Sequence, residues 1–207
     1  MPSLGRLHLI TDTRPGRDPL TVARAALAVA GPRLVVQVRV TDATTDREAY
    51  ELTCRIAALC AEAGATCLVN DRLHVALAAG AAGGHVGADD LPVAAARRVL
   101  GPTAVLGATA RTPEAAGRAV ADGATYLGVG PCFATTTKTG LPDPIGPAGV
   151  RRVAGAVTVP VIAIGGVTPA SVPSLLAAGA YGVAVVGAIG AAADPGRATA
   201  DFLEVLP

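Results

Sequence analysis

Three residue types that often contact substrates occur once each in this sequence: Gln37, Asn70 and Lys138. Each stands where a short apolar run ends. All other cationic side chains apart from histidine are arginines, so the single lysine indicates a position that requires a compact ammonium group. We therefore expect these residues to belong to a binding site. The alternative is that they are scattered surface residues in a chain rich in Ala, Gly and Arg.

Two carboxylates, Asp71 and Asp90, follow two consecutive apolar runs and could together bind a hard divalent cation. Mg2+ is usually held by one or two carboxylates, with water and substrate phosphate oxygens completing its octahedron. Each residue also has an ordinary explanation, because an aspartate just before a helix is a common N-cap. His85, between them in the sequence, is more typical of a packed strand histidine than of a metal ligand.

Glycines follow two later apolar runs, in Ile164–Pro169 and Val185–Ala188. Glycine lets backbone N–H groups approach an anion, and a following helix N-terminus favours negative charge, although a simple turn has the same composition. The pattern predicts a site for one phosphate group here. A second anion site, around Arg39, Asn70, Lys138 and the two aspartates, has enough positive charge for a diphosphate. Two phosphorylated substrates and Mg2+ indicate a transfer reaction with diphosphate as the leaving group.

The elements that would position these residues alternate regularly between strand and helix. The predicted strands are Leu7–Ile10, Leu34–Val38, Cys67–Asn70, Gly84–Gly87, Ala104–Ala108, Tyr126–Gly130, Val161–Gly165 and Gly182–Gly187. The predicted helices are Leu20–Ala30, Arg47–Ala63, Leu73–Ala79, Pro92–Leu100, Pro113–Ala121, Ala148–Ala154, Pro169–Ala178 and Arg197–Val205. Eight such pairs predict an α/β fold of the (β/α)8 TIM-barrel type, and without a dividing linker we expect residues 1–207 to form a single domain.

Local signals support this division. Thr112–Pro113 and Thr168–Pro169 are typical helix starts, and glycines stand where several helices should end. An open doubly wound sheet has the same rhythm, but the first strand is not followed by the G-x-G-x-x-G pattern of dinucleotide-binding folds. In a TIM barrel the catalytic residues lie at the carboxyl ends of the strands. The residues predicted to converge there are Gln37, Arg39, Asn70, Asp71, His85, Asp89, Asp90, Thr109, Thr135, Thr137 and Lys138.

The composition narrows the class of protein. About half of the 207 residues are hydrophobic (51%), only 2% are aromatic, and the net charge is +1. Val, Leu, Ile and Ala suit parallel strands buried on both faces, whereas a stacking platform or basic patch for nucleic acid is absent from the sequence. Four cysteines without C-x-x-C spacing are expected to be reduced, packed thiols. With no signal peptide or membrane-length apolar run, we expect a cytoplasmic protein without nucleic-acid or membrane partners, able to form a homo-oligomer through its Ala-rich helices.

Several motifs, in order and spacing, resemble those of the thiamine phosphate synthase family over essentially the whole chain. The motifs are Leu9–Asp12, Gln37–Arg39, Val69–Arg72, His85–Gly87, Asp90–Pro92, Gly128–Pro131, Thr135–Lys138 and Ala163–Pro169. The resemblance implies that 4-amino-2-methyl-5-hydroxymethylpyrimidine diphosphate condenses with hydroxyethylthiazole phosphate, giving thiamine phosphate and diphosphate. In the family's mechanism the C–O bond breaks first, and the thiazole nitrogen captures the pyrimidinylmethyl cation.

The same resemblance assigns roles to single residues. Asp71 and Asp90 would bind Mg2+, while Arg39, Asn70 and Lys138 would bind the diphosphate and stabilise its departure. Gln37 is also expected to contact substrate, and Thr109 stands where the family usually has a serine touching the pyrimidine. The thiazole phosphate would be held by Thr135, Thr137, Gly166, Val186 and Gly187.

The chain departs from the family pattern at several positions. Thr41 replaces a lysine, Ala88 replaces a glutamine, and Gly187 replaces a serine. A related thiazole tautomerase shares the fold and carries an acid–base histidine just after the fifth strand, where this chain reads Thr109–Arg111 without histidine. We therefore favour the synthase over the tautomerase. A non-catalytic binder of phosphorylated thiamine precursors is a further alternative, and diphosphate release distinguishes the synthase from both.

Overall fold

The computed structural model describes residues 4–135, 137 and 140–207 and contains a closed barrel of parallel strands. The strands pair in chain order from β1 to β8, and β1 closes the barrel against β8. Their bounds are β1 Leu7–Ile10, β2 Leu34–Val38, β3 Thr66–Asn70, β4 Gly83–Val86, β5 Val105–Thr109, β6 Tyr126–Val129, β7 Val161–Ile164 and β8 Gly182–Val185. The predicted TIM-barrel fold is confirmed.

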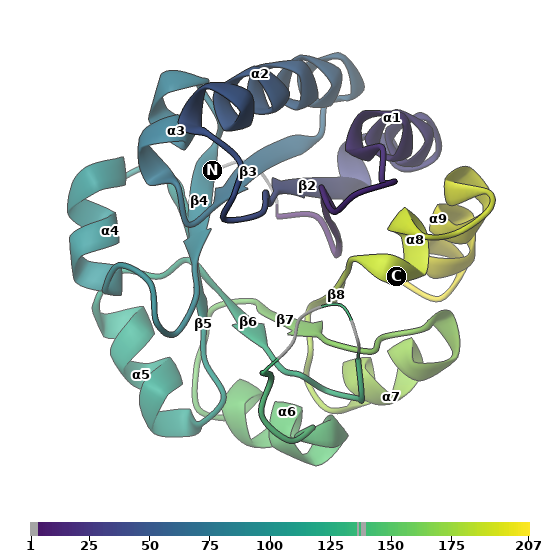
Figure 1. The fold of residues 1–207 in the computed structure, drawn as a ribbon. Helices are drawn as coiled ribbons and strands as arrows, with labels where there is room; N and C mark the ends of the chain where they lie inside the picture. The colour runs from purple at the N-terminus through teal and green to yellow at the C-terminus, as the bar shows by residue number, and fades with distance from the viewer. Residues whose placement is uncertain (1–3, 136, 138–139) are drawn as a thin grey trace.

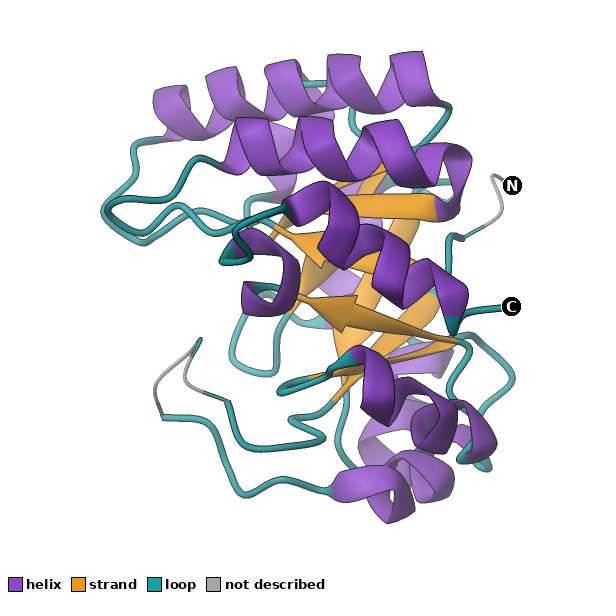
Figure 2. Ribbon diagram, turned by 90° about the vertical axis from the view of Figure 1, so that its right-hand side faces the viewer, coloured by secondary structure: helices purple, strands orange, loops and turns teal. Residues whose placement is uncertain are grey.

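Helices form a ring outside the strands (Figure 1). Their bounds are α1 Pro19–Ala30, α2 Asp46–Ala63, α3 Leu73–Ala78, α4 Val93–Leu100, α5 Pro113–Ala121, α6 Gly146–Ala154, α7 Val172–Ala177, α8 Gly187–Gly190 and α9 Pro195–Glu204. Short 3-10 helices cover Gly31–Arg33 and Pro169–Ser171. Figure 2 shows the strand arrowheads pointing away from the end of the barrel at which the C-terminus lies.

Two apolar layers stabilise the barrel. The larger layer lies between strands and helices and consists mainly of Ala, Val and Leu, together with Phe202. The smaller layer fills the barrel interior and contains Ile10, Val35, Leu68, Tyr126, Ile162 and Ala184. Because both faces of each strand are covered, the strands are largely apolar on both faces rather than alternating, as expected for parallel sheets, with a few buried polar residues such as Gln37 and His85.

The helix signals read from the sequence mostly act as predicted. The side chain of Thr112 accepts a hydrogen bond from the backbone N–H of Ala115 at the start of α5 (3.2 Å). Helix α2 ends at Gly64, which adopts the left-handed conformation (φ 67°) that glycine tolerates. These local stops set the lengths of the helices that return the chain to the next parallel strand.

Most predicted bounds differ from the observed ones by one or two residues, and two of the differences have a further structural content. The helix predicted over residues 169–178 begins as a 3-10 turn, and α7 starts only at Val172, because Pro173 is tolerated in the first turn of an α-helix and not in its interior. The last strand was predicted to reach Gly187 but ends at Val185, and Gly187 opens the short helix α8. Ile189 within that helix is fully buried.

None of the helices in the described part of the chain is both long enough and apolar enough to cross a membrane.

Candidate active site

A continuous chain of hydrogen bonds links four side chains inside the barrel near the carboxyl ends of the strands. Gln37 Nε2 donates to the Tyr126 hydroxyl (3.3 Å), which lies 3.0 Å from His85 Nδ1. His85 Nε2 lies 3.0 Å from Thr109 Oγ1. The four residues come from β2, β6, β4 and β5, so the closed barrel brings together positions as far apart as 89 residues in the sequence. Gln37 and Thr109, both predicted substrate contacts, are thus the two ends of one network.

Burial makes this network neutral. His85 is 8% exposed, and loss of hydration lowers its pKa to about 4 despite the opposing effect of Asp90. Burial raises the pKa of Tyr126 above its usual value. The His8 ring meets the Tyr126 ring edge-on, with ring centres 5.3 Å apart, and burial lowers the pKa of His8 to about 3. An uncharged imidazole can both donate and accept a hydrogen bond, which His85 needs to do here.

The two predicted metal-binding carboxylates follow adjacent strands. The backbone N–H of Asp71 donates to the backbone oxygen of His85 (2.9 Å), which joins the end of β3 to β4. Asp71 has a left-handed backbone (φ 60°), and among the described residues other than glycine it alone has a positive φ. Such backbone strain is concentrated at functional sites. Asp90 accepts a hydrogen bond from the backbone N–H of Gly87 at Oδ2 (2.7 Å), which closes the turn after β4.

Neither aspartate is the N-cap residue of the helix that follows it. Helix α3 begins at Leu73 with Arg72 in the N-cap position, and α4 begins at Val93 with Pro92 in that position. The simpler explanation considered for both residues is therefore wrong. Within the described residues, no cluster of three or more His, Cys, Asp or Glu side chains could hold a metal ion by itself. Any metal bound by the two aspartates would need further oxygen ligands from substrate or water.

Arg39 and Asn70 lie at the ends of the neighbouring strands β2 and β3. The backbone of Arg39 is held by Thr11, whose hydroxyl accepts from Arg39 N and donates to Arg39 O, both at 2.8 Å. No carboxylate in the described part of the chain forms an ion pair with the Arg39 guanidinium. Asn70 is in register with His85 across β3 and β4. Both side chains therefore start from the rim that holds Asp71 and the interior network.

The predicted phosphate-binding residues meet on the opposite side of the rim. The backbone N–H of Thr137 and its hydroxyl both contact Thr135 Oγ1, at 3.3 Å. Gly166 (φ 64°) is packed so closely against this loop that an added Cβ would collide with the backbone oxygen of Ala134. A Cβ on Gly187 would lie 3.7 Å from Thr137 Oγ1, and Val186 precedes Gly187 as the N-cap residue of α8.

Lys138, the predicted catalytic and diphosphate-binding cation, lies outside the described residues.

The sequence assigned no role in the site to some residues near the rim. Tyr126 was read only as the first residue of a strand, although a lone tyrosine followed two positions later by Gly128 could have indicated an inward-facing polar group. Arg111 donates from Nε to the backbone oxygen of Gly130 (3.1 Å) and from Nη2 to that of Asp143 (2.6 Å). Asp12, after β1, forms a two-pronged ion pair with Arg14, whose guanidinium lowers the pKa of Asp12.

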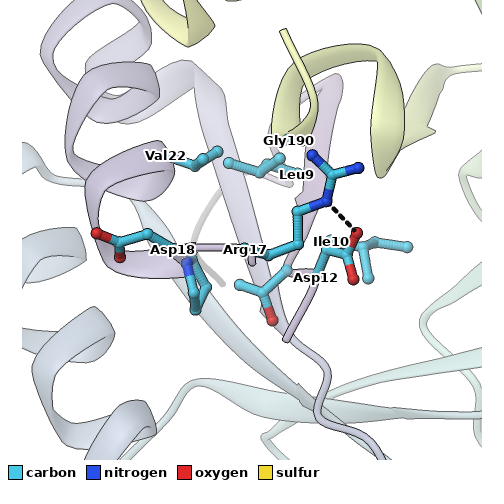
Figure 3. A pocket seen from close by; sticks show the side chains of 9 residues that line it. Leu9, Ile10, Asp12, Arg17, Asp18, Val22 and Gly190 are labelled. Carbon is cyan, nitrogen blue, oxygen red and sulfur yellow. Dashed lines mark ion pairs between the residues drawn. The ribbon is translucent and has the colours of Figure 1, made fainter. Parts of the chain in front are cut away.

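A small pocket beside Asp12 lies between β1, the start of α1 and the end of α8 (Figure 3). Arg17 Nε reaches Asp12 Oδ2 across it at 3.5 Å. The lining residues are Leu9, Ile10, Thr11, Asp12, Arg17, Asp18, Pro19, Val22 and Gly190. None of them belongs to the predicted site, and their polar side chains have partners elsewhere in the fold: Asp12 pairs with arginines, Thr11 bonds to the Arg39 backbone, and Asp18 caps α1. We therefore assign this pocket to the packing of the loop between β1 and α1.

The cysteines are free thiols, as predicted. Cys132, beside the threonine-rich loop, is buried, and its Sγ lies 3.4 Å from the backbone oxygen of Val129. Burial raises its pKa to about 11, so the reactive thiolate is disfavoured at neutral pH.

Comparison with known proteins identifies the family. Residues 7–189 match the family model described as thiamine monophosphate synthase. Over 206 residues the chain is 72% identical to a thiamine-phosphate synthase of Salinispora arenicola and 70% identical to that of Salinispora tropica, covering 100% of this chain and 99% of each relative. The structure of thiamine phosphate pyrophosphorylase from Pyrococcus furiosus superposes with a TM-score of 0.86 at 33% identity, covering 97% of this chain and 94% of that one. The chain therefore belongs to the thiamine phosphate synthase family of transferases.

Proposed function

We propose that the chain carries out the thiamine-phosphate synthase reaction by a dissociative, Mg2+-assisted step. 4-Amino-2-methyl-5-hydroxymethylpyrimidine diphosphate first loses diphosphate. The bond between the exocyclic CH2 carbon and the diphosphate oxygen breaks, and its electron pair leaves with the oxygen. The nitrogen of hydroxyethylthiazole phosphate then donates its lone pair to the CH2 carbon, giving thiamine phosphate.

The observation that carries the proposal is the order of residues around the rim of the barrel. An arginine, an amide and two aspartates follow β2, β3 and β4, whereas threonines and glycines gather where β6, β7 and β8 end. The first group has the chemistry that a diphosphate requires, and the second can surround a single phosphate with hydroxyl and backbone N–H donors. The interior network lies below them, where the pyrimidine ring would join the two sites.

Arg39, Asn70 and Lys138 have the proposed role of stabilising the departing diphosphate. Negative charge accumulates on the leaving group as the C–O bond ionises, so cations already directed at it stabilise the transition state more than the ground state. Arg39 suits this role because no described carboxylate neutralises it. The chain need not supply a nucleophile, since the thiazole nitrogen is one.

Asp71 and Asp90 are the residues that would hold Mg2+. The donor set fits this ion: two carboxylates from adjacent strand ends leave several coordination positions for water and phosphate oxygens, which is how Mg2+ is usually bound together with phosphorylated substrates. When bound, Mg2+ would neutralise part of the diphosphate charge. The left-handed backbone of Asp71 sets the position from which its side chain extends. The hydrogen bond from Gly87 N to Asp90 Oδ2 holds the Asp90 carboxylate.

Thr135, Thr137, Gly166, Val186 and Gly187 have the proposed role of binding the thiazole phosphate. Anchoring this phosphate would orient the thiazole nitrogen toward the CH2 carbon before ionisation, so that capture of the cation is faster than its reaction with water. The close approach of Gly166 to Ala134 supports this role, because it holds the threonine-bearing loop against the end of β7.

The decisive experiment mixes the purified chain with both substrates and Mg2+ and measures diphosphate and thiamine phosphate. We expect equal amounts of the two products. A tautomerase or a non-catalytic binder would release no diphosphate, and that result would overturn the proposal. The tautomerase carries its acid–base histidine just after the fifth strand. In this chain that segment contains Arg111, which donates to backbone oxygens.

Lys138→Ala tests the role assigned from the sequence, with Lys138→Arg as the matched variant. We expect Lys138→Ala to lower kcat at least about 100-fold, the usual cost of removing one group that stabilises developing charge. Lys138→Arg should recover only part of the rate if a compact ammonium is required. A melting temperature that falls in parallel with activity would mean that Lys138 serves the fold instead.

The cytoplasmic location and the homo-oligomer expected from the sequence stay predictions.

A further inference from the structure

The direction of each hydrogen bond in the interior network can be deduced, because each of its members has a limited number of donors. Gln37 directs its amide nitrogen, a donor, at the Tyr126 hydroxyl. Tyr126 has one proton, so its hydroxyl accepts from Gln37 and donates to His85 Nδ1. A neutral imidazole that accepts at Nδ1 carries its proton on Nε2. His85 Nε2 therefore donates to Thr109 Oγ1, and the proton of Thr109 is left for another partner.

This order of donors and acceptors determines which hydrogen bonds Gln37 and Thr109, the two ends of the network, can make with a ligand. Within the described part of the chain, Gln37 Oε1 accepts no hydrogen bond, and no buried side-chain nitrogen or oxygen lacks a partner. Gln37 Oε1 therefore is not completely buried, although the residue as a whole is only 4% exposed, and it can act only as an acceptor. The Thr109 hydroxyl, which accepts from His85, keeps its own proton to donate. The opposite proton order would exchange the two roles.

Two glycines in the barrel strands leave room for the rings of His85 and Tyr126. An added Cβ on Gly107 would collide with the Tyr126 ring and with His85 Nδ1, and one on Gly128 would lie 3.0 Å from His85 Cε1. Gly107 in β5 is in register with His85 on one side and Tyr126 on the other, and Gly128 follows Tyr126 by two residues in β6, so the side chains that these glycines lack leave the space that the rings fill. His8 packs against Tyr126 and donates elsewhere, with its Nε2 3.1 Å from the backbone oxygen of Gly5.

We infer that Tyr126 and His85 are positioning residues that hold Gln37 as an acceptor and Thr109 as a donor, and that this fixed polarity selects an aminopyrimidine over its oxo analogue. The inference rests on the proposed function for the identity of the ring. A 4-aminopyrimidine offers an amino N–H beside an unprotonated ring nitrogen, which complements an acceptor beside a donor. The analogue with a carbonyl in place of the amino group turns an acceptor toward Gln37 Oε1, which is repulsive, and a ring N–H toward Thr109 in place of the acceptor that the Thr109 proton would meet, so the complementary pair of contacts is lost.

The proton order can be tested without any substrate. The full chain, labelled with 15N-histidine, is examined at neutral pH by long-range 1H–15N correlation, with signals assigned by comparison with His8→Asn and His74→Asn variants. We expect His85 to be the tautomer with the proton on Nε2 and none on Nδ1. A proton on Nδ1 would overturn the inference, because Tyr126 would then have to donate to Gln37.

The selectivity is tested with the 4-amino and 4-oxo pyrimidine diphosphates as competing substrates. We expect the wild-type chain to prefer the amino substrate about 100-fold or more in kcat/KM, because a site built for one polarity leaves buried groups unpaired with the other. The oxo compound also ionises at a different intrinsic rate. The informative quantity is therefore the change in this preference between variants, in which the intrinsic rates cancel.

Tyr126→Phe removes the link that orders the network, and Tyr181→Phe is the matched control. Tyr181→Phe also removes one phenolic hydroxyl. In the wild type that hydroxyl donates to the backbone oxygen of Leu4 (2.8 Å) at the opposite end of the barrel. We expect Tyr126→Phe to reduce the preference about 10-fold or more while KM for the thiazole phosphate changes little, and Tyr181→Phe to leave both unchanged. A preference retained in Tyr126→Phe would overturn the inference.

A second pair of variants covers the case in which Tyr126→Phe does not fold. Thr109→Val removes the donor at the other end of the network and should reduce the preference, whereas Thr109→Ser keeps the hydroxyl and should restore it. A preference that survives Thr109→Val would also overturn the inference. Failure of the proposed function would be recognised separately, as the absence of diphosphate release from either pyrimidine, and the His85 tautomer would still decide the proton order.

Discussion

Arg111 holds the backbone oxygen of Asp143 at 2.6 Å, at the far end of the loop that joins β6 to α6. Its Nε also donates to the backbone oxygen of Gly130, just before that loop begins. One guanidinium on the neighbouring β5–α5 connection therefore contacts both ends of the segment that carries Thr135 and Thr137. The contact to Asp143 spans 32 residues of sequence.

Arg111→Ala should weaken binding of the thiazole phosphate. The variant loses two hydrogen bonds from a charged donor, so we expect KM for the thiazole phosphate to rise about 10-fold or more while KM for the pyrimidine diphosphate changes less. Steady-state kinetics with each substrate varied in turn measures the difference. Arg118→Ala, on the exposed side of α5, is the matched control and should change neither KM. An equal rise in both KM values would mean that Arg111 serves general packing.

Asp71→Asn should lower the activity and leave the stability of the fold unchanged. Asparagine tolerates the left-handed backbone of residue 71, so the fold should be retained, while the loss of a charged ligand should lower kcat by about 100-fold and raise the Mg2+ concentration needed for half-maximal rate. Thermal unfolding and a Mg2+ titration measure the two effects. Asp122→Asn, an exposed residue at the end of α5, should behave like the wild type. A drop in melting temperature that matches the loss of rate would assign Asp71 to the fold.

Gly187→Ser should improve binding of the thiazole phosphate. An added Cβ at residue 187 would meet Thr137 Oγ1 at an ordinary contact distance of 3.7 Å, so the side chain fits without displacing the loop. The serine hydroxyl would then add a donor at the start of α8, and we expect KM for the thiazole phosphate to fall several-fold, to about one-fifth. Gly187→Ala separates the hydroxyl from the Cβ and should show no such gain. An unchanged KM in Gly187→Ser would exclude this position from the phosphate site.

Acidification should destabilise the fold through His8. Burial lowers the pKa of folded His8 to about 3, below its usual value of 6.5, so the imidazole takes up a proton only on unfolding. Its contribution to the free energy of unfolding is complete above pH 6.5 and is lost as the pH falls from 6.5 toward 3, by up to ~1.4 kcal/mol per pH unit. Urea unfolding at pH 7, 6 and 5 measures this slope. His8→Asn should show a shallower slope, and identical slopes would contradict the assignment.

Much of the architecture could be predicted from the sequence because it depends on local signals. Runs of Val, Leu and Ile marked the strands, and Thr112–Pro113 and Gly64 marked helix ends, since capping and left-handed turns require particular residue types within a few positions. The α-helix predicted over residues 169–178 starts later than predicted, after a 3-10 turn. Pro173 is compatible with the first turn of an α-helix but not with its interior, so the α-helix begins at Val172.

The site was predicted less completely. Strand ends placed Gln37, Asn70 and Asp71 at one rim, because parallel strands in a closed barrel all end on the same side. The sequence could not distinguish Asp71 and Asp90 from helix caps, since both explanations use an aspartate before a helix. The structure excluded capping by starting α3 and α4 after other residues.

The sequence by itself determined the order of strands and helices, the family and the set of polar residues at the strand ends, because these depend on residue types and their spacing along the chain. Only the tertiary structure decided that Gln37, Tyr126, His85 and Thr109 form one network and that Arg111 reaches both ends of the β6–α6 loop. These contacts join residues on different strands and loops, and their distances are set by closure of the barrel, which no local pattern encodes.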